Sequence, residues 1–361
     1  METELKMQVR PEDVVALRRH PLLDRYALDR PREQILSGIY FDTKKHDLRQ
    51  ADAQLRVRQV NQDWIQTLKA GGTAVAGLYE RNEWESKVNG PRPDLDALCR
   101  RIDSKSRFAK LMKKLPKRGQ LLPTFTTSVK RTVWDLRLPG GDEVECVIDQ
   151  GNIEANDATA PVSELELELK AGDPKHLFDL ALQLQQDVPM QIGNFSKADR
   201  GYDLLTPRPF VAVKATPVQL QPRMSIEEAF KTIVINCLAQ IQSNQPGLFV
   251  QHDADSLHQM RVGLRRLRSA WAMFEDHIAC PAEIVSELRW LGLTLGAARN
   301  WDVLKASTLP GLRGLMADAD ILQPLHEAVE NKIRLNHETV AAAAGSPRTR
   351  SRRGISSRSP S

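Results

Sequence analysis

Charged side chains occupy every second position in several short stretches of the first 170 residues. The residues between them are mostly apolar, for example Leu5, Trp84 and Leu165. Because successive side chains of a β-strand point to opposite faces, each stretch predicts a strand with one charged and one apolar face. The alternating charged positions are Glu2, Glu4 and Lys6; Arg56 and Arg58; Arg81, Glu83, Glu85 and Lys87; Glu143, Glu145 and Asp149; and Glu164, Glu166, Glu168 and Lys170.

The first 205 residues are predicted to be rich in strands. We expect strands at 2–9, 37–43, 53–60, 63–69, 80–88, 124–138, 142–155 and 161–170, joined by turns rich in Gly, Pro, Asn and Asp. Amphipathic helices are expected at 92–115 and 173–187. Antiparallel strands of this number favour a closed barrel over a sandwich, because closure gathers every charged face into one interior. The prediction is an α+β fold, an eight-stranded antiparallel tunnel β-barrel with a polar interior and covering helices.

The pattern changes to helical after Ser225, an N-cap candidate with Glu228 three residues later. Helices are expected at 225–243, 253–278, 281–298 and 319–344, which together form an all-α helical-bundle domain. The predicted domains are a tunnel domain at 1–205, a proline-rich linker at 206–224, the helical domain at 225–344 and a disordered Arg/Ser-rich tail at 345–361.

Composition narrows the class of protein. The net charge of +5 comes from five arginines in the last 17 residues, so the preceding residues are formally neutral. A general nucleic-acid binder would carry its excess charge in the folded part, so nucleic acid is an unlikely partner. There is no run of 18 apolar residues to cross a membrane, and the charged N-terminal strand argues against a signal peptide. Four scattered cysteines suit a reducing compartment, so we expect a cytoplasmic protein.

The charged strand faces carry the groups needed to bind a polyanion through a divalent metal. Carboxylates are the hard oxygen ligands that Mg²⁺ or Mn²⁺ prefers, and lysine and arginine bind phosphate oxygens. The candidate metal ligands are Glu2, Glu4, Glu164, Glu166 and Glu168. The candidate phosphate-binding groups are Lys6, Arg56, Arg58, Lys69, Lys87, Arg131, Lys197 and Arg200. The alternative is a set of cross-strand ion pairs on a solvated sheet face, and the pattern leaves it open.

The opening residues ETELK resemble the Glu-x-Glu-x-Lys signature of CYTH domains, the triphosphate tunnel metalloenzymes. Further segments resemble this family in the family's own order: YFDT at 40–43, LRVR at 55–58, TLKA at 67–70, WESK at 84–87, IDQG at 148–151, SELELELK at 163–170 and KADRGYDLL at 197–205. The resemblance covers nearly all of residues 1–205. It implies an eight-stranded tunnel that binds inorganic triphosphate and hydrolyses it with Mg²⁺ or Mn²⁺.

The resemblance also implies roles for individual residues. Glu2 and Glu4 match the opening metal ligands, and Glu166 and Glu168 the later pair, with Glu164 as the alternative register. The candidate catalytic residues are the signature lysine Lys6 and the acidic wall residues Glu83 and Glu85. The substrate-binding candidates are Arg56, Arg58, Lys69, Lys87, Arg131, Lys197 and Arg200. Asp149 either matches an acidic position of the family motif or is a turn residue before Gly151.

One predicted helix carries a ladder of basic side chains. His258, Arg261, Arg265 and Arg268 recur at steps of three and four, with Arg266 adjacent, beside an apolar stripe that runs from Leu257 to Phe274. A solvated basic face would look similar, but no acidic residue lies in this helix between Asp255 and Glu275. These five basic residues are our candidates for binding the phosphates of a linear polyanion.

The segment HQMRVGLRRLRSAWAMF at 258–274 resembles the opening signature of CHAD domains, and LGAARNWDVL at 295–304 is similar to a second CHAD motif. The family more often has Asp where this chain has Asn300. The resemblance covers about half of a usual CHAD domain, so we expect a truncated one, and it implies binding of long-chain polyphosphate.

The primary hypothesis is therefore a metal-dependent inorganic triphosphatase that releases pyrophosphate and phosphate. On the same fold, a thiamine triphosphatase or a class IV-type adenylate cyclase is the alternative. A non-catalytic polyphosphate-binding protein is the alternative from another class.

Overall fold

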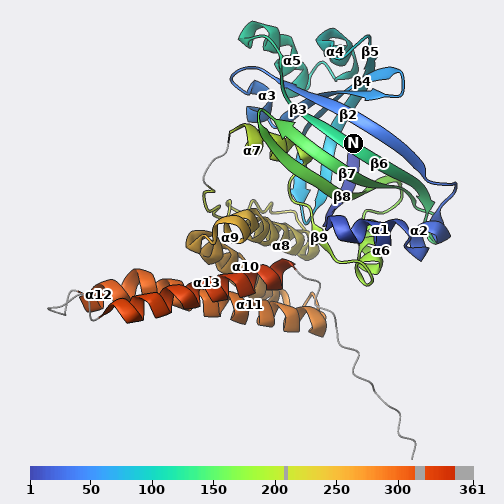
Figure 1. Cartoon of the computed structure of the whole chain (residues 1–361). Coiled ribbons are helices and arrows are strands. Elements are labelled where there is room, and N and C mark those ends of the chain that lie inside the picture. The colour runs from blue at the N-terminus through green and yellow to red at the C-terminus, as the bar shows by residue number, and fades with distance from the viewer. Residues whose placement is uncertain (207–209, 314–321, 346–361) are drawn as a thin grey trace, which may run out of the picture.

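The computed structural model describes residues 1–206, 210–313 and 322–345, and its first 206 residues contain nine strands (Figure 1). These are β1 (Glu2–Val9), β2 (Arg32–Asp42), β3 (Ala53–Val60), β4 (Asp63–Val75), β5 (Leu78–Val88), β6 (Leu122–Arg137), β7 (Glu143–Ala155), β8 (Ala158–Ala171) and β9 (Met190–Ile192). Eight of them correspond to the predicted strands. The short β9 was not predicted.

Eight strands close into an antiparallel barrel, as predicted. The order along the sheet is β5-β4-β3-β2-β6-β7-β8-β1, and β1 returns to pair with β5. The closing register places Glu2 opposite Arg81 and Glu4 opposite Tyr79. Strand β1 then leaves β5, and its second half pairs with β9 from Met7 to Val9. Closure removes the free sheet edges and gives the barrel a separate interior.

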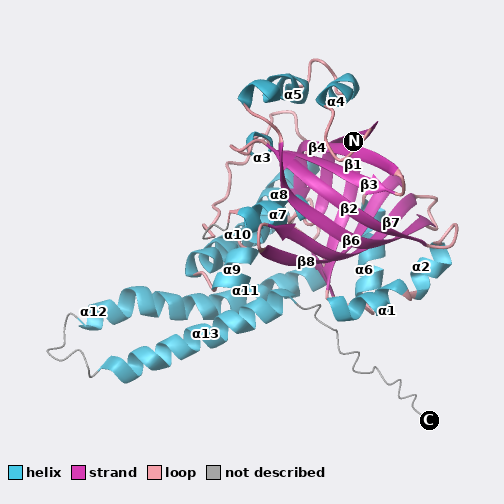
Figure 2. Cartoon of the chain, turned by 45° about the horizontal axis from the view of Figure 1, so that its top comes forward, coloured by secondary structure: helices cyan, strands magenta, loops and turns pink. Residues whose placement is uncertain are grey.

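Helices pack on two apolar regions of the barrel's outer face, while the outer side of β2 and β6 is open toward the viewer in Figure 2. The helices of this part are α1 (Val14–Arg18), α2 (Pro21–Tyr26), α3 (Asp47–Gln50), α4 (Leu95–Arg101), α5 (Arg107–Arg118), α6 (Lys175–Gln185) and α7 (Lys197–Leu205), with a short 3₁₀ turn η1 (Pro11–Asp13). One core joins Leu5, Leu165 and Trp134 to the inner side of α6. A second joins Leu55 and Leu68 to α4 and α5. The apolar positions between the charges thus face outward, as the alternation predicts.

The single helix predicted at 92–115 is instead two helices, α4 and α5. The break has a local cause: Asp103 accepts a hydrogen bond from the Lys105 N–H, and the Ser106 side chain caps α5 by accepting one from Phe108 N–H. The turn redirects the chain so that Leu98 and Phe108 both pack on the same outer face of the barrel.

One end of the barrel interior is apolar, which the charge pattern did not predict. Inward-facing Tyr40 and Phe125 stack with ring centroids 4.5 Å apart, and Tyr202 of α7 packs edge-on to Phe125 at 5.2 Å. Ala198 and Val129 complete this cluster. Helix α7 therefore fills one end of the interior, and the charged part of the barrel lies beyond it.

The helical half is built from α8 (Ile226–Ser243), α9 (Gln245–Gln251), α10 (Ala254–Phe274), α11 (Ala282–Val303), a π-helical turn η2 (Leu304–Thr308), α12 (Leu309–Arg313) and α13 (Gln323–Gly345). Its core includes Leu257, Met260 and Leu264 of α10, packed against Ile241 of α8 and Leu295 of α11. Helices α11 and α13 run side by side away from the barrel in both views (Figures 1 and 2).

The segment predicted as a linker is extended where it is described, and it is tied to the helical half. Asn244 accepts from Val213 N–H at 2.9 Å and donates back to the Val213 carbonyl at 2.8 Å. The tail predicted to be disordered, apart from Gly345, lies outside the described residues. Among the helices described, none is both long and apolar enough to cross a membrane.

Asp42 fixes the apolar end of the barrel, and its removal should destabilise the fold. Its fully buried carboxylate accepts hydrogen bonds from the backbone N–H groups of Thr43, Leu48 and Arg49 and from the Tyr202 hydroxyl, at 2.7 to 3.0 Å. Asp42→Ala leaves these donors without an acceptor, so we expect the free energy of unfolding to fall by about 3 kcal/mol or more in urea titrations. Asp203→Ala, at an exposed position of the same region, is the control. Equal stability of the two variants would contradict this role.

Candidate active site in the barrel

A cavity of about 330 Å³ lies in the charged part of the barrel interior. Its lining is almost entirely polar. The cationic lining residues are Lys6, Arg56, Arg58, Lys69, Arg81, Arg131, Lys170 and Lys197, and the acidic ones are Glu2, Glu4, Glu83, Glu85, Glu145, Glu166 and Glu168. The two signs nearly balance across the whole cavity, but they are not evenly distributed within it.

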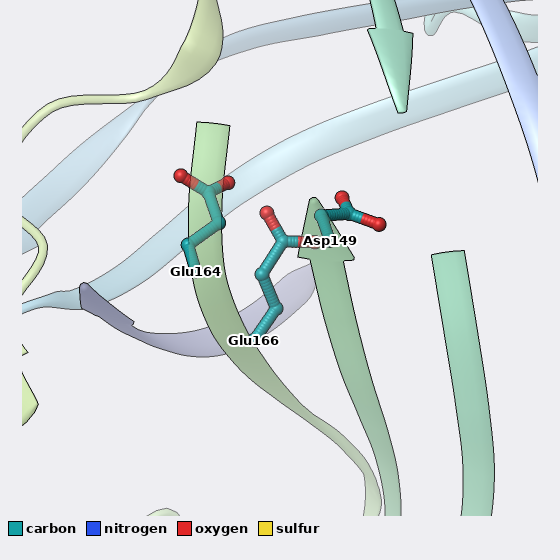
Figure 3. A group of neighbouring side chains, drawn as sticks. All are labelled: Asp149, Glu164 and Glu166. Atoms are coloured by element: carbon teal, nitrogen blue, oxygen red, sulfur yellow. The ribbon is translucent and has the colours of Figure 1, made fainter. Parts of the chain in front are cut away.

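The deepest acidic group consists of Asp149, Glu164 and Glu166, whose carboxylate oxygens lie within 4.8 Å of one another (Figure 3). Glu164 and Glu166 lie on one face of β8, and Asp149 lies on the neighbouring β7, where it is fully buried inside the strand. Asp149 is therefore not the turn residue considered as an alternative. Three like charges this close require cations among them.

Four cations supply that balance, one of them Arg200 at 3.6 Å from Glu164. Arg131 binds Asp149 through two hydrogen bonds of 2.8 and 2.7 Å. Lys197, the first residue of α7, contacts Asp149 at 2.8 Å and Glu166 at 3.0 Å and also bonds Glu164. Lys6 bonds Glu166 and reaches Glu4 at 3.3 Å. Burial would raise the pKa of Glu166, but these cations hold it well below its usual range. These cations compensate much of the charge of this group, although Glu164 Oε2 is buried without a hydrogen-bond partner among the described residues.

A second carboxylate group, Glu2, Glu4 and Glu168, is less well compensated. Glu4 and Glu168 are direct cross-strand partners on β1 and β8. Burial, followed by the Glu4 and Glu83 carboxylates, raises the pKa of Glu2 to about 7 despite Lys69. Burial and the nearby Glu2 and Glu145 also raise the pKa of Glu168. The pKa values of Glu2 and Glu168 are thus raised although Lys69 bonds Glu2 and Lys170 lies 2.7 Å from Glu168, so one lysine each does not offset burial and the neighbouring carboxylates.

Glu2 provides an independent sign of a missing cation. One of its oxygens bonds Lys69, but the other, Oε2, is buried and receives no hydrogen bond from any described residue. Glu4 is different, because Lys6 and Arg81 hold its pKa at about 2 against the effect of burial. Glu2, Glu4 and Glu168 therefore fit a hard divalent cation by their oxygen donors, and Glu2 also by its unpaired buried oxygen.

The opposite imbalance occurs at Arg56 and Arg58 on β3. Arg56 is half-buried in the wall and makes no ion pair with any residue in the described part of the chain, and its Nε is without a hydrogen-bond partner there. Two causes lower the pKa of Arg58 to about 10, although Glu85 lies 3.3 Å away. The larger is the positive charge of the neighbouring Arg56, and the smaller is burial. Two guanidinium groups on one strand, with Glu85 as the one ion-pair partner among the described residues, have the chemistry to bind an anion.

Most of the predicted site residues are gathered in this cavity, and three are not. Lys87 lies near the end of β5, where it is exposed and bonds Asp63 at 2.7 Å. Arg200 turns to the Pro161 carbonyl and Glu164. Glu164 is buried and does not line the cavity; its carboxylate bonds Lys197. The alternation predicted the correct face for Lys87, but the strand carries it beyond the enclosed part of the barrel.

Several cavity residues were not among the candidates. They are Arg81, Tyr40, Gln54, Thr67, Glu145, Val147, Lys170, Ser196 and Ala198. The charge alternation could have identified Arg81 as a site residue, because it belongs to the same alternating run as Glu83 and Glu85. It donates to Glu4 at 3.2 Å and lies over the Tyr79 ring. Ser196 caps α7 in a capping box with Asp199, which positions Lys197 at the helix start.

In the helical half, three side chains of the predicted basic ladder are exposed on α10: Arg261, Arg265 and Arg268. None of these three forms an ion pair with a described residue. Burial, followed by Arg299, lowers the pKa of His258, so this side chain is neutral near pH 7. Arg266 faces elsewhere, donating to Gln240 at 2.8 Å and Asn236 at 2.7 Å of α8. Arg266 therefore holds two helices together.

Comparison with known proteins agrees with this division. The CYTH domain model matches residues 1–202, and the CHAD domain model matches residues 232–353. An inorganic triphosphatase of Haemophilus influenzae is 30% identical over 201 residues, which is 56% of this chain and 54% of that protein. The chain thus spans about half the length of the curated relative it matches.

Two solved structures are also similar. One, from Hippeastrum, is described as an adenylyl cyclase candidate with a dominant triphosphatase activity. It is 19% identical, covers 57% of this chain and 98% of its own, and has a TM-score of 0.39. The other is the CHAD domain of Ricinus communis, which is 41% identical over 38% of this chain and 46% of its own, with a TM-score of 0.35.

The raised pKa of Glu2 predicts a pH dependence of stability in protein freed of metal by a chelator. A carboxyl whose folded pKa of about 7 exceeds its ordinary value of 4.5 binds more protons when folded, so its contribution to stability falls as pH rises between these values. Glu2→Gln removes this term. The free energy of unfolding is measured in urea at pH 5 and at pH 8. Between these pH values, we expect the free energy of unfolding of Glu2→Gln to rise by on the order of 2 kcal/mol relative to that of the wild type. An equal difference at both pH values would contradict the assignment.

Proposed function

Because this chain belongs to the CYTH family, we propose that it hydrolyses inorganic triphosphate to pyrophosphate and phosphate inside the barrel, with Mg²⁺ or Mn²⁺. The observation that supports this most directly is the uneven charge of the cavity wall. Arg56 has no ion pair among the described residues and Arg58 has Glu85 alone, while the pKa values of Glu2 and Glu168 stay raised although Lys69 and Lys170 contact them. A metal–triphosphate complex carries both missing signs, so it complements the two regions at once.

The wall residues have separate roles in this proposal. Arg56, Arg58, Lys69, Arg81 and Arg131 bind phosphate oxygens and hold the triphosphate extended. Glu83 and Glu85 position these cations, since Glu85 contacts Arg58 at 3.3 Å and Glu83 lies 3.7 Å from Lys69. Lys6 and Lys197 keep the buried carboxylates ionised and fixed.

Glu2, Glu4 and Glu168 are the residues we propose to hold the metal. Bound there, a divalent cation would neutralise phosphate charge and lower the pKa of the attacking water. The sequence favoured Glu166 and Glu168 as the later pair, with Glu164 as the alternative register. We assign Glu164 and Glu166 to the network with Lys6 and Lys197, because both lysines contact each of them, whereas Glu168 has Lys170 alone among the described residues.

The composition of the lining favours inorganic triphosphate over thiamine triphosphate or ATP. Apart from Tyr40, the lining contains only Val147 and Ala198 as apolar residues. An adenine or thiazole ring would need an aromatic or apolar surface to offset the loss of its hydration. The described cavity offers it almost none.

The free thiols fit a reducing compartment. Cys99, Cys146, Cys237 and Cys280 are all unpaired within the described residues. We therefore place the enzyme in the cytoplasm, where glutathione and thioredoxin keep thiols reduced.

The triphosphatase proposal is tested by phosphate release with Mg²⁺ and Mn²⁺, using inorganic triphosphate, thiamine triphosphate and ATP side by side. We expect inorganic triphosphate to be cleaved fastest and EDTA to stop the reaction. Glu4→Gln keeps the size of the side chain but removes a metal-binding charge, so activity should fall by about a hundredfold or more. Glu33→Gln, whose side chain pairs with Lys130 outside the barrel, is the matched control. Full activity of Glu4→Gln would overturn the proposed site.

The helical half supports a second function, binding of long-chain polyphosphate. Arg261, Arg265 and Arg268 follow one side of α10, exposed and without ion pairs among the described residues. A linear polyanion could occupy all three guanidinium groups together, and its binding would be weakened by salt.

This binding is tested on the full chain by titrating fluorescent long-chain polyphosphate with EDTA present. Replacing Arg261, Arg265 and Arg268 together by Ala should weaken binding at least about tenfold at low salt. The matched control replaces three exposed lysines of α5, Lys110, Lys113 and Lys117, by Ala, which removes the same charge elsewhere. Equal weakening in both triple variants would show that only net charge matters.

A further inference from the structure

We propose that Gln242 and Gln245, in the helical half, are positioning residues for the barrel site because they clamp the two segments that hold the backbone of Lys6. This inference rests on the proposed triphosphatase function. It assigns to the helical half a role in catalysis that is separate from polyphosphate binding.

The backbone of Lys6 lies where β1 changes partners. Residues Glu2–Leu5 pair with β5, and Met7–Val9 pair with β9. Between them, the Lys6 N–H donates to the Gly77 carbonyl at 2.9 Å, and the Lys6 carbonyl accepts from the Gly193 N–H at 2.8 Å. Both backbone groups of this residue are thus held by segments outside the regular ladder.

The two holding segments approach Lys6 very closely. A Cβ on Gly77 would lie 2.7 Å from the Lys6 carbonyl oxygen, and one on Gly193 would lie 2.9 Å from Lys6 Cγ. The turn before β5 also contains Ala76 at φ 55°, a left-handed conformation that costs a non-glycine residue free energy. Such a conformation persists only where the surroundings hold it.

One corner of the helical half holds both segments. Gln242 of α8 accepts a hydrogen bond from the Ala76 N–H at 2.9 Å, directly before Gly77. Gln245, the first residue of α9, accepts from Asn194 Nδ2 at 2.8 Å, directly after Gly193. The intervening Asn244 is fully buried and bonds the Gln240 carbonyl at 2.7 Å, which fixes the angle of this corner.

Two successive hydrogen bonds therefore connect each glutamine to Lys6, whose side chain lines the cavity. The Lys6 ammonium contacts Glu4 and Glu166, so a shift of the Lys6 backbone would move the carboxylates on both β1 and β8. Small displacements of catalytic groups lower the rate of the chemical step more than they weaken substrate binding. The clamp should thus act mainly on kcat.

The test uses the full chain with Gln242 and Gln245 both changed to Ala, and separately both changed to Glu. Glutamate keeps an acceptor oxygen at each place, so it should restore what alanine removes. Gln323→Ala is the matched control, since Gln323 bonds Glu327 within its own helix. Two readouts are needed: kcat and KM for triphosphate with Mg²⁺, and backbone hydrogen exchange in peptides covering residues 4–9 and 190–194.

For the double alanine variant we expect kcat to fall roughly tenfold, KM to stay within about twofold, and exchange at Lys6 and Gly193 to accelerate roughly tenfold. The double glutamate variant and Gln323→Ala should match wild type in both readouts. Unchanged kcat or unchanged exchange in the double alanine variant overturns the clamp. If that variant does not fold, the two single alanine variants are judged by the same criteria.

The failure of the proposed function gives a different result. A wild-type chain that does not cleave triphosphate refutes the triphosphatase proposal, while exchange at Lys6 and Gly193 still decides whether Gln242 and Gln245 hold these segments.

Discussion

The pairing of β1 with β5 is the constraint on which the rest of the site depends. Without it, Glu2 and Glu4 would lie on an open sheet face, where water screens their charge. Closure encloses them opposite Arg81 and Tyr79, where the effective dielectric is lower. Buried charges of one sign would then destabilise the fold, so every strand that adds a carboxylate to the interior must meet a cation from another strand. The mixed signs along the chain are a requirement of closure as much as of chemistry.

The period of the charge pattern predicted which face each side chain takes, and this was correct even for Lys87. A strand has a side-chain period of two, so a single charged residue known to face inward sets the face of all the others on that strand. The pattern could not show how far along the barrel a residue lies. Lys87 leaves the enclosed part near the end of β5, and Phe125 faces inward on β6 within the apolar end that α7 fills. Both depend on strand stagger, which no local pattern records.

Choosing among Glu164, Glu166 and Glu168 also required contacts that are distant in sequence. All three recur at the same spacing, so the pattern alone could not fix the register of the pair that the family resemblance placed at Glu166 and Glu168. The difference comes from Lys197, which α7 brings beneath Glu164 and Glu166 but not Glu168. The helical ladder shows the same limit on a smaller scale. Arg266 is one residue from Arg265, yet that single step of about 100° turns it toward α8.

The ion pairs within the cavity mean that ligand binding is an exchange of partners. Lys69 bonds Glu2, and Arg81 bonds Glu4. A phosphate oxygen that attracts either cation leaves a carboxylate with less counter-charge, and that carboxylate then attracts a divalent ion more strongly. By thermodynamic reciprocity, the ion favours the phosphate to the same extent. The two ligands would therefore bind cooperatively, and the barrel would discriminate against free phosphate chains and free metal ions alike.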